Sequence, residues 1–147
     1  MVLYADTSAL VRAYFVDEDN HEELRSLLFE GDDVVVTSEL ARLEFTSATL
    51  AAARAGRIRS ARTVLARFDA DCGDEGPLTL IALEATNILP EAHRLLVDHA
   101  LRTLDAIHLA VALIELPNLA TPPDIGFVSR DETQAAAAAA EGLTRVG

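Results

Sequence analysis

Short, largely apolar runs alternate along the chain with longer stretches in which apolar positions recur every three or four residues. Each short run holds four or five residues, the usual length of a strand that is buried on both faces. The longer stretches have the period of an amphipathic helix. The predicted strands are Val2–Ala5, Val34–Thr37, Leu78–Ala82, Ile125–Ser129 and Leu143–Val146.

Helical stretches separate these strands, so the pattern predicts an α/β fold with a central parallel sheet and helices on both faces. The predicted helices are Ser8–Val16, His21–Glu30, Glu39–Ala55, Ile58–Asp71, Ala85–Leu101, Leu104–Leu116 and Glu132–Glu141. Gly142 follows the last of them, at the position where a glycine often ends a helix. No repeat or long linker divides the 147 residues, which predicts one domain spanning residues 1–147.

Composition narrows the class of protein. Hydrophobic residues make up 50% of the chain, as in globular domains. No apolar run approaches the roughly 20 residues that a membrane-spanning helix needs, so we expect no membrane association. Cys72 is the single cysteine, and the first residues do not resemble a secretory signal. We therefore expect a cytoplasmic protein without a disulfide.

The charge of the chain excludes several functions. A net charge of −12 argues against nonspecific binding to nucleic acid, although metal ions could neutralise the excess where a substrate binds. All 12 basic side chains are arginines. The absence of lysine excludes a phosphate-binding loop of the Walker type, whose lysine contacts the phosphates. It also argues against a phospho-accepting receiver domain, which carries a lysine near its acidic pocket.

Two aspartates follow predicted strands. Asp6 comes directly after Val2–Ala5, and Asp131 comes shortly after Ile125–Ser129. The carboxyl ends of parallel strands meet at one edge of a sheet, and open α/β sheets bind their ligands there. Each aspartate also precedes a predicted helix, so the alternative interpretation for both is a helix cap.

Two further acids fall on helices. We expect Glu44 to share an inward face with Leu40, Leu43 and Ser47, where an ionised carboxylate needs a partner or a metal. The alternative is a salt bridge at the edge of the core. Asp105 lies in the first turn of a helix that is otherwise almost entirely apolar and therefore buried. Its alternative role is to complement the helix dipole.

The four carboxylates can converge at the carboxyl edge of the predicted sheet. Ionised carboxylates this close repel one another unless cations are present or protons are taken up. Ligation by oxygen alone suits Mg²⁺ or Mn²⁺ rather than zinc. His108, one turn after Asp105, either lines this site or belongs to the core. Ser8 and Ser129 flank two of the aspartates and either orient ligands or cap locally.

Half of the arginines lie in one segment between Arg42 and Arg67, in which Glu44 is the only acid. This distribution suggests a strip that contacts the phosphate backbone of a nucleic acid. The alternatives are a solvated helix face and a surface for an acidic partner. The candidate residues for backbone contacts are Arg54, Arg57, Arg59 and Arg62.

Three stretches and one further acid resemble the PIN-domain family, and within it the VapC toxins of bacterial toxin–antitoxin pairs. They are Leu3–Leu10 (LYADTSAL), Glu44, Leu101–Ala110 (LRTLDAIHLA) and Ser129–Asp131 (SRD). The resemblance covers the whole chain and implies a sheet of order 3-2-1-4-5. It also implies a ribonuclease that depends on Mg²⁺ or Mn²⁺, with Asp6, Glu44, Asp105 and Asp131 as its acidic set.

The resemblance therefore predicts an endoribonuclease toxin that hydrolyses RNA with water activated by a metal ion. Asp6, Asp105 and Asp131 are the expected metal ligands, and Glu44 positions the water or accepts its proton. The expected partners are an RNA substrate, a cognate antitoxin and a second copy of the chain. The alternatives are a catalytically silent PIN-like module that binds RNA or protein, and a hydrolase of small phosphate esters.

Overall fold

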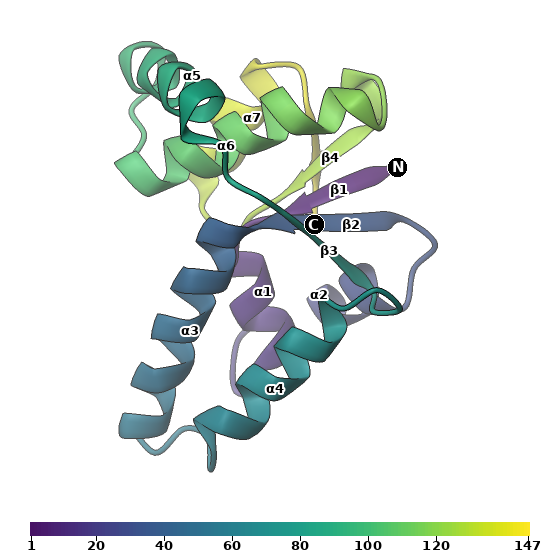
Figure 1. The fold of residues 1–147 in the computed structure, drawn as a ribbon, viewed down its shortest axis with the longest axis vertical. Helices are drawn as coiled ribbons and strands as arrows, with labels where there is room; N and C mark the ends of the chain where they lie inside the picture. The colour runs from purple at the N-terminus through teal and green to yellow at the C-terminus, as the bar shows by residue number, and fades with distance from the viewer.

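Five parallel strands form one sheet in the order β3-β2-β1-β4-β5, in a computed structural model that describes residues 1–147 (Figure 1). The strands are β1 (Val2–Ala5), β2 (Val34–Ser38), β3 (Leu78–Ile81), β4 (Ile125–Val128) and β5 (Thr144–Val146). In the central strand, Val2 pairs with Val34 on one side and with Ile125 on the other. The parallel sheet confirms the predicted fold class, and its strand order is the one that the resemblance implies.

Seven α-helices cover the two faces of the sheet, with α1–α4 on one side and α5–α7 on the other (Figure 1). They are α1 (Thr7–Tyr14), α2 (His21–Phe29), α3 (Glu39–Arg54), α4 (Ala61–Asp71), α5 (Ala85–Asp98), α6 (Thr103–Glu115) and α7 (Glu132–Ala140). All seven predicted helices are present. The start of α4 was predicted too early, because Ser60 caps the helix by accepting a hydrogen bond from the amide of Thr63 at 3.2 Å.

Two hydrophobic cores lie on opposite faces of the sheet. One comprises 17 buried residues, chiefly between the sheet and α5–α7, and the other comprises 15, chiefly between the sheet and α1–α4. β1 contributes to both, because Tyr4 points into the first core and Leu3 into the second. Burial on both faces explains why its sequence is an unbroken apolar run.

The later strands are added to opposite sides of β1, so the direction of strand addition reverses there. β2 and β3 lie on one side, and β4 and β5 lie on the other. Such a reversal opens a crevice outside the carboxyl ends of the central strands. Asp6 sits at this point, and its amide donates a hydrogen bond to the carbonyl of Val128 at 3.1 Å.

The inward face of α3 was predicted wrongly. Its buried residues are Ala41, Phe45, Thr49 and Ala52, whereas Leu43 is 70% exposed. Both faces of this helix carry apolar residues, so periodicity alone does not select one. Phe45 decides the orientation, because it stacks on Phe68 of α4 with ring centroids 4.5 Å apart. Glu44 consequently lies at the border between the two faces.

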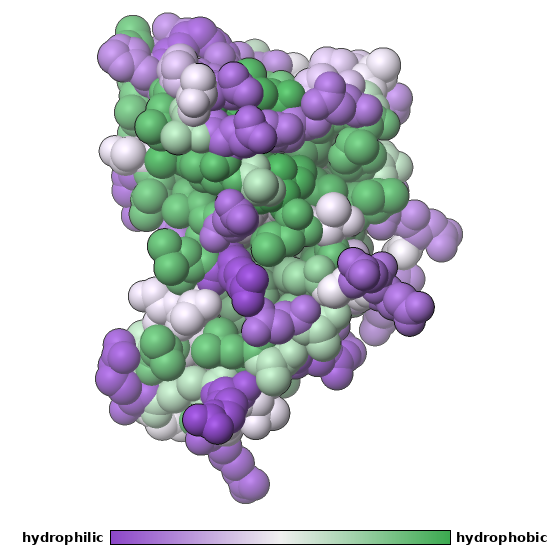
Figure 2. Space-filling model, in the orientation of Figure 1, coloured by the Kyte–Doolittle hydropathy of each residue, from purple (hydrophilic) through white to green (hydrophobic).

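The surface shown in Figure 2 is apolar mainly over the sheet and the α5–α6 layer, and hydrophilic side chains project at the end where α3 and α4 are joined. Several large apolar side chains are exposed, including Leu89, Val97 and Leu104. None of the helices combines the length and the apolar composition needed to cross a bilayer.

The orientation of α3 can be tested with two neighbours of Glu44. We predict that Phe45→Ala lowers the free energy of unfolding by about 3–5 kcal/mol, because it empties a buried aromatic site. Leu43→Ala serves as the matched control and should change it by less than about 0.5 kcal/mol. Urea denaturation followed by circular dichroism measures both values, and equal losses would show that α3 is oriented differently.

Candidate active site

A polar pocket of about 280 Å³ opens at the carboxyl edge of the sheet, and no hydrophobic residue lines it. Its walls come from the start of α1, from α3, from the start of α6 and from the loop after β4. The pocket is lined by the four acids selected from the sequence, by Thr7, Ser8 and His108, and by the arginines Arg12, Arg102 and Arg130. Acids from four separate segments of the chain therefore meet in one place.

Asp6 is the most deeply buried of these acids, at 3% exposure. Its Oδ1 caps α1 by accepting hydrogen bonds from the amide of Ala9 at 3.2 Å and from the hydroxyl of Ser8 at 2.7 Å. Burial raises the pKa of Asp6, and the charge of His108 and these two bonds only partly oppose the effect. Asp6 is thus both a helix cap and a member of the site, and Oδ2 lies 3.3 Å from the hydroxyl of Ser129.

Asp105 and Asp131 share one arginine. The Nε of Arg102 donates to Oδ2 of Asp105 at 3.0 Å, and its terminal nitrogen donates to Oδ2 of Asp131 at 3.2 Å. The bond to Asp105 is the main reason why the pKa of Arg102 is raised, and the charge of Asp131 adds to it. Asp131 also caps α7, because its Oδ1 accepts a bond from the amide of Gln134 at 2.9 Å. The cap interpretation therefore holds for Asp131 as well.

The donor set of this pocket fits a hard divalent cation. Asp6, Asp105 and Asp131 offer carboxylate oxygens only, the ligand type that Mg²⁺ and Mn²⁺ prefer. In this arrangement no three acidic, histidine or cysteine side chains are gathered closely enough to hold a metal ion together. Instead, the guanidinium of Arg102 bridges two of the carboxylates and supplies positive charge where a cation would.

Glu44 is held by two donors on the same oxygen. Its Oε1 accepts hydrogen bonds from the hydroxyl of Thr7 at 2.8 Å and from Nε2 of His108 at 2.5 Å. Burial opposes ionisation of Glu44, but the bonds from His108 and Thr7 outweigh it and lower the pKa of the carboxyl. Glu44 therefore stays ionised and is paired at the edge of the core. Its Oε2 accepts no hydrogen bond from the protein.

Ser129 and Gln134 connect the acids behind the pocket. The hydroxyl of Ser129 lies 2.6 Å from Oε1 of Gln134 and accepts a bond from the amide of Asp131 at 3.0 Å. Nε2 of Gln134 donates to the main-chain carbonyl of Asp105 at 3.3 Å. Ser129 thus contacts a carboxylate and a local amide at once, so its two predicted roles do not exclude one another. Ser8 instead donates to Asp6 and accepts from the distant amide of Arg130 at 2.9 Å, so it does not cap locally.

Several residues of this network were not selected as site residues from the sequence, among them Thr7, Tyr4, Arg102 and Gln134. Tyr4 lies two residues before Asp6 and so on the same side of the strand, a signal that period-two reasoning offers. Arg102 stands three residues before Asp105, the spacing of a helical ion pair. Gln134 is fully buried just before the alanine run of α7, and its polarity there was the available signal.

The arginine-rich segment is less available than its composition suggests. Three of its six arginines form ion pairs: Arg42 with Asp69, Arg57 with Asp17 and Glu18, and Arg67 with Asp71, one turn later on α4. Arg54, Arg59 and Arg62 are exposed and have no such pair. Arg54 follows Glu44 by ten residues on α3 and thus lies about 15 Å further along the helix axis.

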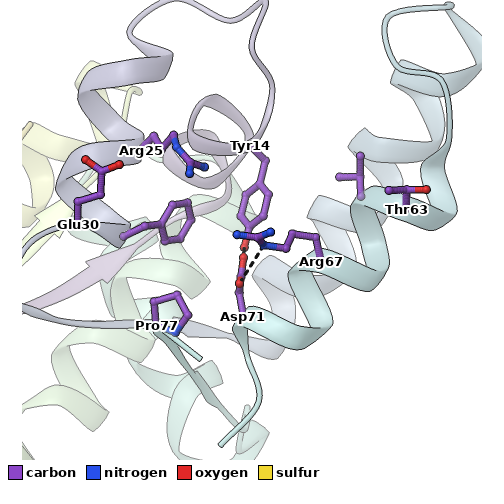
Figure 3. A pocket seen from close by; sticks show the side chains of 9 residues that line it. Tyr14, Arg25, Glu30, Thr63, Arg67, Asp71 and Pro77 are labelled. Carbon is purple, nitrogen blue, oxygen red and sulfur yellow. Dashed lines mark hydrogen bonds and ion pairs between the residues drawn. The ribbon is translucent and has the colours of Figure 1, made fainter. Parts of the chain in front are cut away.

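A larger pocket, of about 670 Å³, lies away from the acids among α1, α2 and α4 (Figure 3). Tyr14, Phe29, Val64 and Pro77 give it an apolar part. The hydroxyl of Tyr14 donates a hydrogen bond to Asp71, which also pairs with Arg67, as Figure 3 shows. None of the four acids of the candidate site lines this pocket.

The sequence matches the family described as the PIN domain over residues 3–140. The chain belongs to the PIN-domain family. No curated protein matches the sequence significantly. VapBC2 from Rickettsia felis, bound to a promoter DNA fragment, superposes with a TM-score of 0.66 at 12% identity over 99% of this chain and 98% of that one.

Two further solved structures share the fold. VapC20 from Mycobacterium tuberculosis, described as a toxin that cleaves the sarcin–ricin loop, has a TM-score of 0.65 at 19% identity, covering 92% of this PIN domain chain and 94% of its own. A toxin–antitoxin complex from Klebsiella pneumoniae has a TM-score of 0.58 at 18% identity, and the match covers 92% of this chain and 91% of that one. At these identities the comparisons support the architecture of the PIN fold.

The burial of Asp6 leads to a prediction about how the free energy of unfolding depends on pH. Because burial raises its pKa, the folded protein holds this proton to a higher pH than the unfolded chain does. Ionisation of Asp6 therefore costs stability as pH rises from about 3.9, the unfolded value, to the folded value. We predict that Asp6→Asn, which keeps the capping oxygen, raises the free energy of unfolding at neutral pH in the presence of EDTA.

The free energy of unfolding of Asp6→Asn relative to wild type should rise by about 1.4 kcal/mol for each pH unit between the unfolded and the folded pKa of Asp6. Denaturant titrations at a series of pH values measure it, with Asp32→Asn, an exposed aspartate, as the control. A pH-independent difference between wild type and Asp6→Asn would show that Asp6 carries no buried charge.

Proposed function

We propose that this PIN domain is a metal-dependent endoribonuclease that acts as the toxin of a toxin–antitoxin pair. The observation that carries the proposal is the set of four acids lining one polar pocket at the carboxyl edge of the sheet. The printed descriptions of the structural neighbours support it, since one is a toxin that cleaves the sarcin–ricin loop and another is a toxin–antitoxin complex.

Asp6, Asp105 and Asp131 are the residues that hold the metal. Mg²⁺ or Mn²⁺ bound there would neutralise the scissile phosphate and make water a better nucleophile. Because Arg102 occupies Oδ2 of Asp105 and of Asp131, ligation of a metal through these oxygens requires the release of Arg102. The Arg102 side chain is 79% exposed, so solvent can replace these bonds.

Glu44 accepts the proton of the attacking water. Its Oε2 is the free oxygen of a carboxylate that stays ionised. Attack forms a bond between the water oxygen and phosphorus and breaks the bond from phosphorus to the 3′ oxygen, which takes a proton from solvent. Because water and not the 2′ hydroxyl attacks, the products are a 5′ phosphate and a 3′ hydroxyl.

Two single substitutions test this mechanism. We predict that Asp6→Asn and Asp105→Asn each lower the rate of RNA cleavage in Mn²⁺ by more than about a hundredfold, since even residues that only orient metal ligands cost ten- to a hundredfold. The measurement is single-turnover cleavage of a structured RNA, with the product ends identified by labelling.

Asp32→Asn serves as the control for general effects of charge. Undiminished cleavage by both site variants would remove the proposed mechanism. A wild-type protein that binds RNA without cutting it would favour the silent binding module, and one that hydrolyses only a chromogenic phosphate ester would favour a small-ester hydrolase.

We also propose that Arg54, Arg59 and Arg62 contact RNA phosphates, whereas Arg57 is occupied by Asp17 and Glu18. Each phosphate contact on a single strand adds about 0.7 to the slope of log affinity against log salt. The triple variant Arg54→Ser/Arg59→Ser/Arg62→Ser should therefore lower the slope by about two. Arg145→Ser, which changes an exposed but paired arginine of β5, is the control. An unchanged slope in the triple variant would show that Arg54, Arg59 and Arg62 do not contact RNA phosphates.

The proposed protein partners are a cognate antitoxin and a second copy of the chain. The pocket acids support the first, because clustered carboxylates are suited to bind an inserted arginine. Light scattering of the chain alone and with the product of the adjacent gene tests both partners. A monomer that does not bind that product would contradict both.

A further inference from the structure

A chain of four polar side chains runs from the core to Glu44. The hydroxyl of Tyr4 lies 3.0 Å from the hydroxyl of Ser38 and 2.8 Å from Nδ1 of His108, whose Nε2 lies 2.5 Å from Oε1 of Glu44. Ser38, Tyr4 and His108 are at most 1% exposed, so water does not compete for these bonds. The chain starts at the end of β2 and passes through β1 and α6 to α3.

The hydrogen positions in this chain fix the role of His108. An ionised carboxylate only accepts hydrogen bonds, so Nε2 of His108 carries the hydrogen that Glu44 accepts. Nδ1 then either accepts the hydroxyl hydrogen of Tyr4 or donates to its oxygen. In both arrangements the same imidazole edge faces Glu44, and Tyr4 holds the opposite edge.

The ring of His108 has little freedom to turn. It packs edge-on against Tyr4, with centroids 5.9 Å apart, and Tyr4 itself stacks on Phe127 at 5.5 Å. His108 belongs to α6 on one face of the sheet, whereas Glu44 belongs to α3 on the other. The hydrogen bond from His108 therefore holds the partly exposed carboxylate of Glu44 from the opposite layer of the fold, in addition to the bond from Thr7.

We propose that His108 is a positioning residue for Glu44: together with Thr7 it occupies Oε1 and so leaves Oε2 as the oxygen that faces the substrate. This inference rests on the proposed nuclease function. A purely structural histidine would affect stability alone, whereas a positioning residue acts on cleavage only through Glu44.

Two substitutions separate these roles. His108→Gln can place an amide hydrogen close to the position of Nε2, whereas His108→Asn is too short to reach Glu44. We expect His108→Asn to lower kcat by about ten- to a hundredfold, as loss of an orienting partner does, with KM for RNA and the affinity for Mn²⁺ unchanged. His108→Gln should restore most of the rate. Comparable rates for the two variants would overturn the proposal.

A double-mutant cycle with Glu44→Gln decides whether His108 acts through Glu44. In that background His108→Asn should have no further effect, and the milder Tyr4→Phe should behave in the same way if His108→Asn does not fold. An equal fall in both backgrounds would overturn the proposal. Inactive Asp6→Asn together with fully active His108→Asn would overturn it while leaving the nuclease function intact.

A readout that does not depend on cleavage completes the test. In protein labelled with ¹⁵N-histidine, the Nε2 proton of His108 should be protected from solvent exchange, and Glu44→Ala should abolish this protection. If wild type does not cut RNA but shows the protected proton, the nuclease function fails while the hydrogen-bonded geometry stands. A proton that exchanges freely in wild type would overturn the positioning role itself.

Discussion

The mutual repulsion of four carboxylates is the constraint around which the rest of this structure is arranged. The acids receive donors of three kinds: helix amides for Asp6 and Asp131, Arg102 for Asp105 and Asp131, and a buried histidine for Glu44. Donors of this kind stabilise the charged form, whereas burial opposes it. At Asp6 burial dominates and raises the pKa. The acid whose ionised form the fold disfavours is thus one of the residues that line the pocket.

Caps and site residues are the same side chains in this molecule, and the geometry of parallel sheets explains why. At this edge β1 and β4 are each followed by a helix, and the residue just before that helix, Asp6 or Asp131, is its capping position. The cap uses one carboxylate oxygen of Asp6 and of Asp131 for helix amides. The second oxygen lies near the hydroxyl of Ser129 in Asp6 and accepts a bond from Arg102 in Asp131. Both aspartates line the pocket, so a helix start that requires an acid for stability also places it at the candidate site.

Local chemistry made the strands, the helices and the four acids predictable from sequence, because Val2–Ala5 and Asp6 identify a buried strand and its end without reference to distant residues. The orientation of α3 was not predictable in this way, since Phe45 is selected over Leu43 by packing on Phe68 of another helix. The pairing of Arg57 depends likewise on acids 39 and 40 residues away. The network around His108 was not predictable for the same reason, because it joins residues from helices on both faces of the sheet.

The charges that line the pocket are compatible with the proposed anionic substrate of this acidic protein. Three arginines line it against four acids, which leaves one net negative charge. Arg12 forms no ion pair and donates only to the main-chain carbonyl of Asp19, so its charge is not already neutralised. One divalent cation would turn the local balance to a single positive charge, equal and opposite to that of a phosphodiester. The net charge of −12 therefore does not describe the surface that a bound phosphate would meet.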